Sequence, residues 1–464
     1  MTMTWMKRAM VGVSCLSLLV GSAALAQQAP SAKGSPSEMS LSQAVSSGVM
    51  TNPEYGVVAA SRRATDEELN QAKALWLPSI DLRADGGVEY TDDVGTNGGT
   101  DGDDTETLGR YDSSLTLTQM LFDGWNTKYE NERQKHRVQS SAHRVRETAE
   151  LVGLSIVEFF LEVMRQRELL DITRENVAEH IAIMGMIEEG VTAGRSTQAD
   201  LEQAKARLAS ARAQEASIRE QLRVAEASFQ REVGEMPKDL VLPSIPVDAL
   251  SADVEAEVQA ALSASPTLDI RNEDEKVAYA EYKGTGSTLY PQVDLQLSGR
   301  HGKNLGGVEG DDTSAAAQVV MDWNLYRGGG DVARVREFTH RYQQSKEQRA
   351  QAGREIEDNV RQTWARMVSS GERAREFSAQ AAANAEVVRA YKDQFSLDRR
   401  TLLDVLDAQN ELFVSRTNTI NAEFLEMFSV FSLLGIKGNL LPTLGVAYPR
   451  ESTEIAITEK NIDR

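Results

Sequence analysis

Apolar residues along the chain follow two different periods. In four short stretches apolar and polar residues alternate, which is the pattern of a strand with one apolar and one polar face. These strands are expected at about residues 79–91, 111–122, 292–300 and 315–325. Elsewhere, helical spacing continues for about 65 residues at a time, which corresponds to helices about 100 Å long. Such helices suit coiled coils or the wall of a tube better than a globular core.

The chain carries the same plan twice. The sequence LPSIDL at residues 77–82 recurs as YPQVDL at 290–295, an offset of 213. ADLEQA at residues 199–204 recurs as LDVLDA at 403–408, an offset of 204. One length change in the polar stretch after residue 90 explains the difference, because loops tolerate such changes. These regular offsets predict that the chain contains two copies of one unit, which consists of a helix, a β-hairpin, a long helix and a second helix.

Composition marks the ends of these copies. Lys7 and Arg8 precede an apolar run that closes with Ala24-Leu25-Ala26, the pattern of a cleaved signal peptide. Three prolines interrupt the chain midway, and its last residues are strongly charged. We therefore expect a signal peptide at 1–26, a disordered leader at 27–38, a first repeat at 39–233, a linker at 234–250, a second repeat at 251–441 and a disordered tail at 442–464.

Charge and cysteine content narrow the class of protein. Seventy acidic residues against 50 basic ones give a formal charge of −20, so nucleic acid is not expected as a partner. The single cysteine, Cys15, lies in the predicted signal peptide, so no internal disulfide is expected in the mature chain. After residue 26 no apolar run reaches the roughly 20 residues of a spanning helix, so strands must make any membrane crossing.

Four strands are too few for a closed membrane barrel, which needs at least eight. An open sheet edge in lipid would leave backbone groups unpaired. Several chains would therefore have to share one barrel, and three chains supply 12 strands. Their long helices would continue that barrel as a tube. The pattern predicts a conduit from the outer membrane across the periplasm.

Several motifs resemble those of the TolC family of outer-membrane channels over almost the whole mature length. They are the Asn52-Pro53 and Ser265-Pro266 turns, the two turns at 77–82 and 290–295, LFDG at 121–124, Gly194-Arg195, and RTLLDVLDA at 400–408. The stretch at 193–204 is similar to the branch that serves type I secretion of large adhesins. The resemblance implies a homotrimeric, 12-stranded outer-membrane β-barrel continued by a periplasmic α-helical barrel of coiled coils. It implies as partners a periplasmic adaptor, an inner-membrane ABC transporter or proton-driven pump, and outer-membrane lipid.

The resemblance also implies a periplasmic gate. Asp404 and Asp407 share one helix face, and in a trimer six such carboxylates would narrow the entrance and favour cations. Without the resemblance, a solvated helix face is the favoured explanation of these two residues. Arg400 and Asp200 match positions that hold the family's closed state. Phe395 stands where the family has a tyrosine and has no hydroxyl group, so we expect closure to depend on ion pairs of Arg400 with a neighbouring carboxylate.

Polar residues at the two expected hairpin tips are candidates for docking the adaptor. They are Arg195, Ser196, Arg399 and Thr401. Ordinary solubility of a turn is the alternative reading. The acidic, glycine-rich loop at 92–106 is expected to face outward, most simply as a solvated loop.

Catalysis finds little support in the sequence. H-E-x-x-H, a phosphate-binding Gly-Lys-Ser/Thr loop and G-x-S-x-G are absent. His136 and His143 share a helical face but lack further ligands, so neither a metal nor a cofactor is expected. The function expected is the exit duct of a tripartite export system for type I protein secretion. The alternatives are the outer-membrane component of a drug or metal efflux pump, and a periplasmic coiled-coil scaffold without a pore.

Overall fold

The computed structural model describes residues 38–92, 105–397 and 399–454. The predicted signal peptide, the predicted leader apart from Glu38, most of the acidic loop and the last ten residues lie outside these ranges. Within them, the two copies have the same order of elements. The first copy comprises α1 (Leu41–Thr51), α2 (Pro53–Ala74), β1 (Ser79–Asp92), β2 (Thr105–Phe122), α3 (Asn126–Thr192) and α4 (Gln198–Val233). The second comprises α5 (Val254–Ala264), α6 (Pro266–Thr285), β3 (Gln292–Lys303), β4 (Asp311–Asp322), α7 (Gly330–Ser396) and α8 (Leu402–Lys437).

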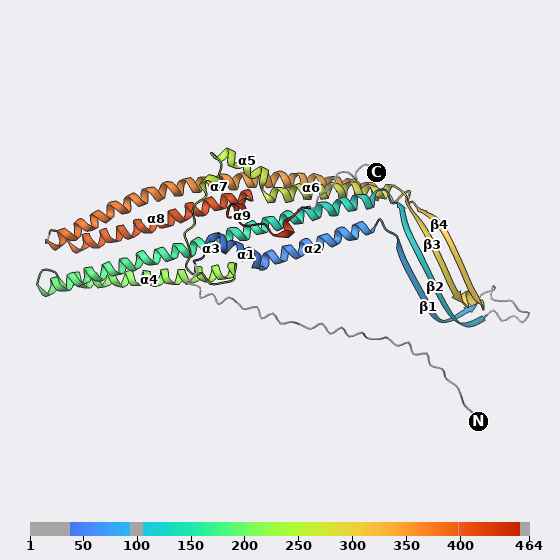
Figure 1. Cartoon of the computed structure of the whole chain (residues 1–464), viewed down its shortest axis with the longest axis horizontal. Coiled ribbons are helices and arrows are strands. Elements are labelled where there is room, and N and C mark those ends of the chain that lie inside the picture. Colours follow the sequence, from blue (N-terminus) through green and yellow to red (C-terminus); the bar gives the residue numbers. More distant parts are fainter. Residues whose placement is uncertain (1–37, 93–104, 398, 455–464) are drawn as a thin grey trace, which may run out of the picture. The chain divides into compact units, whose positions relative to one another are not determined.

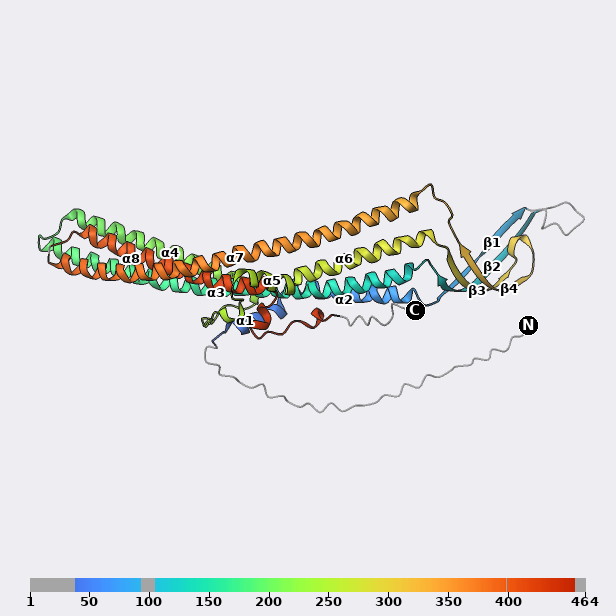
Figure 2. The same cartoon turned by 90° about the horizontal axis from the view of Figure 1, so that it is seen from above.

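The long helices of the two copies are equal in length. The helices α3 and α7 have 67 residues each, and α4 and α8 have 36 each. The helix α4 runs back along α3, and α8 runs back along α7, so each copy ends in a helical hairpin (Figure 1). The shorter α2 and α6 pack on the other halves of the long helices, near the strands, and α6 lies against both α3 and α7 (Figure 2).

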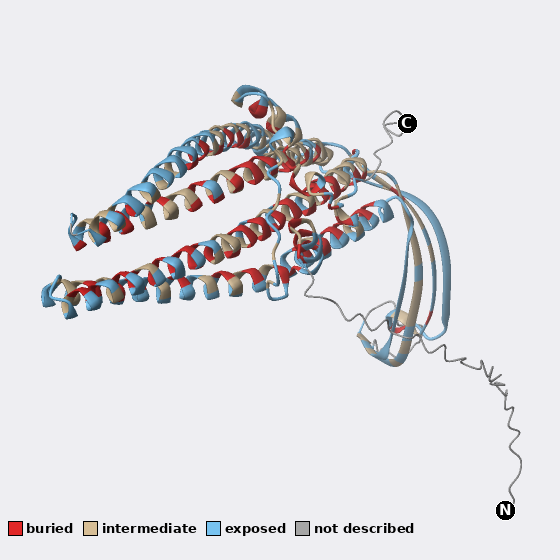
Figure 3. Ribbon diagram, turned by 60° about the vertical axis from the view of Figure 1, so that its left-hand side comes forward, coloured by how far each residue is buried: buried red, intermediate tan, exposed pale blue. Residues whose placement is uncertain are grey.

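The main apolar core lies where the short and long helices meet. Phe160 of α3, Phe229 of α4 and Phe431 of α8 are fully buried there, together with residues of α1. Figure 3 shows buried residues as a stripe along each hairpin that widens in this middle region. Such a one-sided stripe is what a helix packed along one or two neighbours requires.

The four strands form one antiparallel sheet in the order β1-β2-β3-β4. Four of the predicted strand ends differ from the observed ones by three residues or more: β2 begins at Thr105, β3 continues to Lys303, and β4 spans Asp311–Asp322 rather than 315–325. Pairing explains the differences. The residues Thr105 to Arg110 pair with the outer half of β1, and β4 ends where its partner β3 begins, at the pair Gln292–Asp322.

The predicted disordered tail is wrong for residues 442–454. The short helix α9 (Leu440–Thr443) packs on α3 and α8, and Val446 is buried in the core. Tyr448 donates a hydrogen bond to the buried carboxylate of Glu150 in α3, and Tyr55 of α2 donates one to Glu451. Apolar contacts and paired polar groups fix this segment despite its charge.

One described helix, α8, is long and apolar enough to cross a membrane, contrary to the expectation from the sequence. More than half of its apolar stretch is buried against the rest of the fold. The core of the helical region therefore accounts for its composition.

Glycine and a strained tryptophan fix the turn from β2 into α3. Gly124 has φ +67°, and a Cβ there would lie 2.8 Å from the carbonyl oxygen of Ser287. Trp125 also has φ +67° and is held between Phe122 and Tyr290, with ring centroids 5.2 Å from each. A non-glycine residue in this region costs about 1–3 kcal/mol, so the aromatic contacts must offset strain. The second copy has Gly329 at the equivalent position, with φ +84°.

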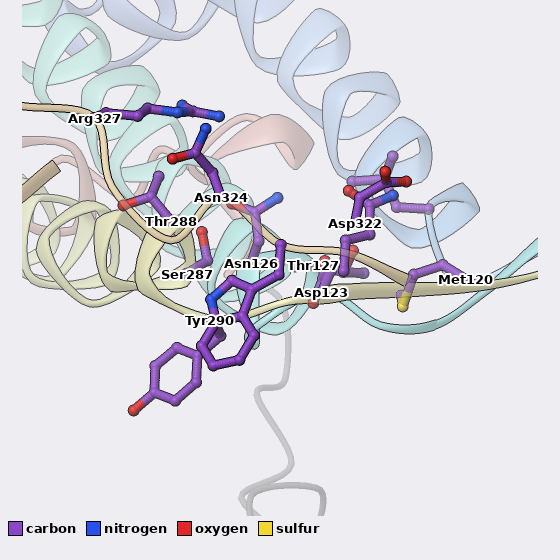
Figure 4. Close-up of a pocket in the computed structure, with 13 residues that line it drawn as sticks. Met120, Asp123, Asn126, Thr127, Ser287, Thr288, Tyr290, Asp322, Asn324 and Arg327 are labelled. Carbon is purple, nitrogen blue, oxygen red and sulfur yellow. Dashed lines mark hydrogen bonds between the residues drawn. The ribbon is translucent and has the colours of Figure 1, made fainter. Parts of the chain in front are cut away.

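A cavity of about 740 Å³ lies beside this turn, between the strands and the helices. Polar side chains gather around it, among them Asp123, Asn126, Thr288, Asn324 and Arg327 (Figure 4). Asp123 accepts a hydrogen bond from the backbone N–H of Thr127, 2.7 Å away, and so caps the start of α3.

Candidate functional site: the hairpin tips and the sheet faces

The two hairpin tips use the same capping arrangement. At the start of α4, the Thr197 hydroxyl oxygen accepts from the Asp200 N–H (3.2 Å), and the Asp200 carboxylate accepts from the Thr197 N–H (2.9 Å). At the start of α8, Thr401 and Asp404 repeat both bonds at 3.3 and 3.2 Å. Hydrogen bonds from the threonine hydroxyls lower the pKa of Asp200 and of Asp404. Both carboxylates therefore stabilise their helix starts.

A tight turn precedes each cap. In the first tip, the Gly190 carbonyl oxygen accepts from the N–H groups of Arg195 (2.8 Å) and Ser196 (3.2 Å), and Gly194 has φ +73°. In the second tip, the Gln394 carbonyl oxygen accepts from the Arg399 N–H at 2.9 Å. Of the predicted docking residues, Arg195, Arg399 and Thr401 are exposed and Ser196 is half-buried.

The structure places Arg400 in contact with its own tip. Its guanidinium lies over the ring of Tyr391, 4.3 Å from the centroid, and its Nε donates to the Gln394 side chain at 3.0 Å. The expected carboxylate partner is Asp404, but the Nη1–Oδ2 distance is 3.8 Å. Cation–π contact and the amide hold Arg400 more closely than this ion pair does.

Asp407 makes a contact that the sequence did not indicate. Arg207 of α4 donates to its Oδ1 at 3.3 Å, so this pair links the hairpin of the first copy to that of the second. Two further ion pairs link the hairpins: Lys392 of α7 with Glu179 of α3, and Arg416 of α8 with Glu175 of α3 at 2.7 Å. Sequence spacing cannot reveal these partners, because they lie about 200 residues or more apart.

A cleft of about 500 Å³ separates the two tips. It brings together six of the residues singled out from the sequence: Arg195, Ser196, Asp200, Phe395, Arg400 and Thr401. Phe395 packs on an apolar cluster that includes Ile183, Ile187 and Leu406. Its ring is therefore placed by apolar contacts between the hairpins. Asp404, Asp407 and Arg399 do not line this cleft.

The two faces of the sheet differ in polarity. One face carries apolar residues in register across all four strands, with Ile80 opposite Leu117, Leu117 opposite Leu297, and Leu297 opposite Ala317. Leu82, Val88, Val319 and Met321 share this face and are exposed. An exposed apolar face of this width is typical of a surface covered by lipid.

The opposite face is charged and internally paired. Arg110 of β2 contacts Asp85 (2.8 Å) and Glu89 (3.4 Å) of β1, and Arg300 of β3 binds the Asp112 carboxylate through two bonds of 2.9 and 2.7 Å. This face suits water and ionic solutes. The sheet therefore has the two surfaces that a transmembrane barrel needs.

Aromatic residues mark one end of every strand, a signal that the sequence reading missed. Trp76, Trp125, Tyr290 and Trp323 lie within three residues of the ends nearest the helices, and all four are about half exposed. Tryptophan and tyrosine gather where membrane and water meet. Their regular placement next to each strand could have been found from the sequence.

The two histidines considered as metal ligands lie between α3 and α6. His136 is 2.7 Å from the Glu273 carboxylate, and His143 is 3.9 Å from Asp269. Within the described ranges no group of three or more His, Cys, Asp or Glu side chains is placed to hold a metal ion.

These features define an outer-membrane channel whose strands lie in the membrane and whose long helical hairpins extend into the periplasm. Over residues 49–235 and 258–424 the sequence matches the family described as outer membrane efflux protein. The chain belongs to this family, which confirms the resemblance to the TolC channels.

Relatives and solved structures agree with this assignment. The outer membrane efflux protein BepC of Brucella suis is 26% identical over 392 residues, covering 82% of this chain and 81% of the relative. The proteases secretion protein PrtF of Dickeya chrysanthemi is 23% identical over 415 residues, covering 84% and 86%. The fold is similar to that of the outer-membrane channel OprN, with a TM-score of 0.76 at 16% identity, over 86% of this chain and 90% of that one.

Proposed function

We propose that three copies of this chain form the exit duct of a tripartite export system. The observation that carries the proposal is the four-stranded sheet with one apolar and one charged face. In the described part of the chain, β1 and β4 are its edges, and they run antiparallel to each other because the order is β1-β2-β3-β4. The edge β4 of one copy therefore fits β1 of the next in an antiparallel ladder, and three copies give a closed ring without unpaired backbone in lipid.

A periplasmic adaptor would dock at the exposed tips, around Arg195, Ser196, Arg399 and Thr401. An ABC transporter would supply the energy if the cargo is a protein, and a proton-driven pump would do so if the cargo is a small molecule. Type I protein secretion is the function we favour, because the first tip is similar to the adhesin-secretion branch and PrtF is a secretion protein. Efflux is the second candidate, because BepC is described as an efflux protein.

We place the gate at the second hairpin tip of each chain. Asp404 and Asp407 would form the ring of carboxylates, with Asp407 held by Arg207 across the hairpins at 3.3 Å. Phe395 would hold the two tips close through its apolar contacts, and Arg400 and Asp200, each bonded within its own tip, would line the cleft between them. A single exposed ion pair contributes at most about 1 kcal/mol. Closure would therefore depend on the three cross-hairpin pairs acting together in each copy.

Single-channel conductance in planar bilayers tests both the duct and the gate. Wild type is expected to give small, cation-selective currents that divalent cations block. Asp404→Ala/Asp407→Ala is expected to give larger currents without that block.

Arg207→Ala should enlarge the currents moderately. The matched control is Arg219→Ala, because Arg219 is on the same helix and pairs only with Glu215 of that helix among the ion pairs found. Inserted trimers that carry no current would instead support the scaffold.

A further inference from the structure

The connection between β3 and β4 folds back over the sheet instead of continuing away from it. The turn η4 (Leu305–Gly307) contacts β2 and β1, which are the two strands beyond β3. The Asn304 side chain donates to the Gly109 carbonyl oxygen of β2 at 2.9 Å. The Gly306 N–H donates to the Glu89 carboxylate of β1 at 3.3 Å. The segment Asn304–Gly310, called the mouth loop below, is thus tied to both strands of the other hairpin.

The mouth loop has a defined backbone conformation. The Asn304 N–H donates to the Gly310 carbonyl oxygen (2.8 Å), and the Gly310 N–H donates to the Asn304 side chain (3.0 Å). Asn304 has φ +55°, and Gly306, Gly307 and Gly310 have φ between +60° and +134°. Glycine and asparagine adopt these angles at the lowest cost. The loop sequence therefore specifies a folded-back conformation.

The loop lies over the charged face of the sheet. Glu89 belongs to that face, since strand residues alternate and its neighbour Val88 is on the apolar face. Gly302 belongs to the same face, and a Cβ there would lie 2.6 Å from Leu305 Cδ1 and 3.1 Å from the Tyr111 carbonyl oxygen. Leu305 therefore occupies the space above Gly302 that any other residue would fill.

Glu89 is fixed from two sides. Arg110 donates to the same carboxylate oxygen that accepts from Gly306, at 3.4 Å, and is itself bound to Asp85 at 2.8 Å. This oxygen joins the charged network of the sheet to the backbone of the loop. Val308 follows η4 in the same loop and is 60% exposed, so the loop held by this network carries an exposed apolar residue.

We infer that the mouth loop narrows the outer end of the channel, and that Val308 lines the passage and limits the size of what leaves it. The inference rests on the proposed function, because the charged face lines the passage only in a closed barrel. The loop would then act in series with the carboxylate gate at the other end. In a trimer, the Val308 side chains of the three chains would surround this opening. Such a ring of apolar side chains restricts hydrated solutes, as hydrophobic constrictions do in other channels.

The first experiment separates the two restrictions. Residues 305–309 are replaced by Gly-Gly, both in wild type and in Asp404→Ala/Asp407→Ala, and single-channel conductance is measured in planar bilayers. In the wild-type background the replacement should change little, because the carboxylate gate dominates the resistance. In the open-gate background it should raise conductance about two-fold or more, as expected when the remaining constriction is removed.

The second experiment uses a reversible block, so it does not depend on the shortened loop folding. In a Cys15→Ser background, Val308→Cys in the open-gate channel is treated with a bulky methanethiosulfonate reagent from the loop side. Current should fall and return on reduction. Val88→Cys is the matched control, because it is the same substitution nearby on the apolar face, and its treatment should leave the current unchanged.

Complete labelling of Val308→Cys with unchanged current would overturn the inference. An open-gate conductance that stays the same when residues 305–309 are replaced would also overturn it. Failure of the proposed function would be distinct, because wild type itself would then carry no current.

Discussion

Glu150 shows at one residue how burial competes with hydrogen bonding. It is only 2% exposed and accepts from the N–H groups of Leu440 (3.0 Å) and Leu441 (3.4 Å) and from the Tyr448 hydroxyl. Those bonds favour the carboxylate, but burial outweighs them and raises the pKa of Glu150 to about 7. Near neutral pH the group therefore titrates inside the folded protein.

The pH dependence of stability follows from this pKa. A carboxyl group that binds its proton more tightly in the folded state stabilises that state fully below its ordinary pKa of about 4.5. That contribution is lost as pH rises from there through about 7. Thermal unfolding midpoints in detergent should therefore fall from pH 5 to pH 8, and Glu150→Gln should make this fall smaller. Glu147→Gln, one turn away and partly exposed, is the control. A slope that Glu150→Gln leaves unchanged would contradict the assignment.

Individual site residues were predictable only where the signal is local. The pattern Thr-x-x-Asp occurs in the sequence at both tips. The capping role of Asp200 and Asp404 could therefore be predicted from the sequence, in addition to the gate role that the family resemblance implies. Arg207 and Lys392 gave no such signal, because their partners lie on other helices. Folding alone brings Arg207 to Asp407.

At the scale of elements, the caps decide where the tip helices begin. Thr401→Ala removes both the hydroxyl oxygen that accepts from the Asp404 N–H and the hydroxyl donor to the Asp404 carboxylate. Loss of such a cap costs about 1 kcal/mol, so amide hydrogen exchange in the first turn of α8 should become faster, roughly five-fold. Hydrogen–deuterium exchange mass spectrometry measures this.

Two variants serve as comparisons for the cap. Thr401→Ser keeps the hydroxyl and should exchange as wild type does, and Thr197→Ala should produce the same acceleration at the start of α4. If exchange at α8 stays the same in Thr401→Ala, the cap does not stabilise the tip.

Hairpin tips could be predicted better than strand ends, for a physical reason. Local chemistry ends a helix: Gly194 and the Thr197 cap bound the first tip, which lies at the residues where the sequence predicts a tip. A strand continues as far as its neighbour pairs with it. Thr105 to Arg110 have weak alternation, yet they form strand because β1 lies alongside. The segment around Val446 and Tyr448 was missed for the same reason, since its partners are hundreds of residues away.

At the scale of the whole molecule, the proposed trimer depends on pairing between the edges of different chains. Cysteines placed on the apolar face of both edges, for example Leu82→Cys in β1 with Val319→Cys in β4, should form disulfides between neighbouring chains. Because β4 of each chain meets β1 of the next, the products on a denaturing gel should end at three chains. Moving the second cysteine along β4 identifies the residue that lies opposite Leu82 of the neighbouring chain. Only cysteines on the apolar face of β4 should form the disulfide.

The chain provides its own control for this cross-link. Leu82 and Leu115 are direct partners within one chain, so cysteines at these positions should link β1 to β2 without increasing the number of chains. Edge cross-links that continue beyond three chains would show an open assembly instead of a closed ring.

The contacts of the C-terminal segment have a consequence for biosynthesis. Tyr448 bonds to a residue 298 positions earlier and Glu451 to one 396 positions earlier, so this segment completes the packing of helices that are synthesised long before it. A chain that stops after α8 would leave the buried carboxylate without the donors of Leu440, Leu441 and Tyr448, and an unpartnered charge of this kind strongly disfavours folding. Chains that stop before this segment are therefore expected to be less stable, and more sensitive to proteases, than chains that contain it.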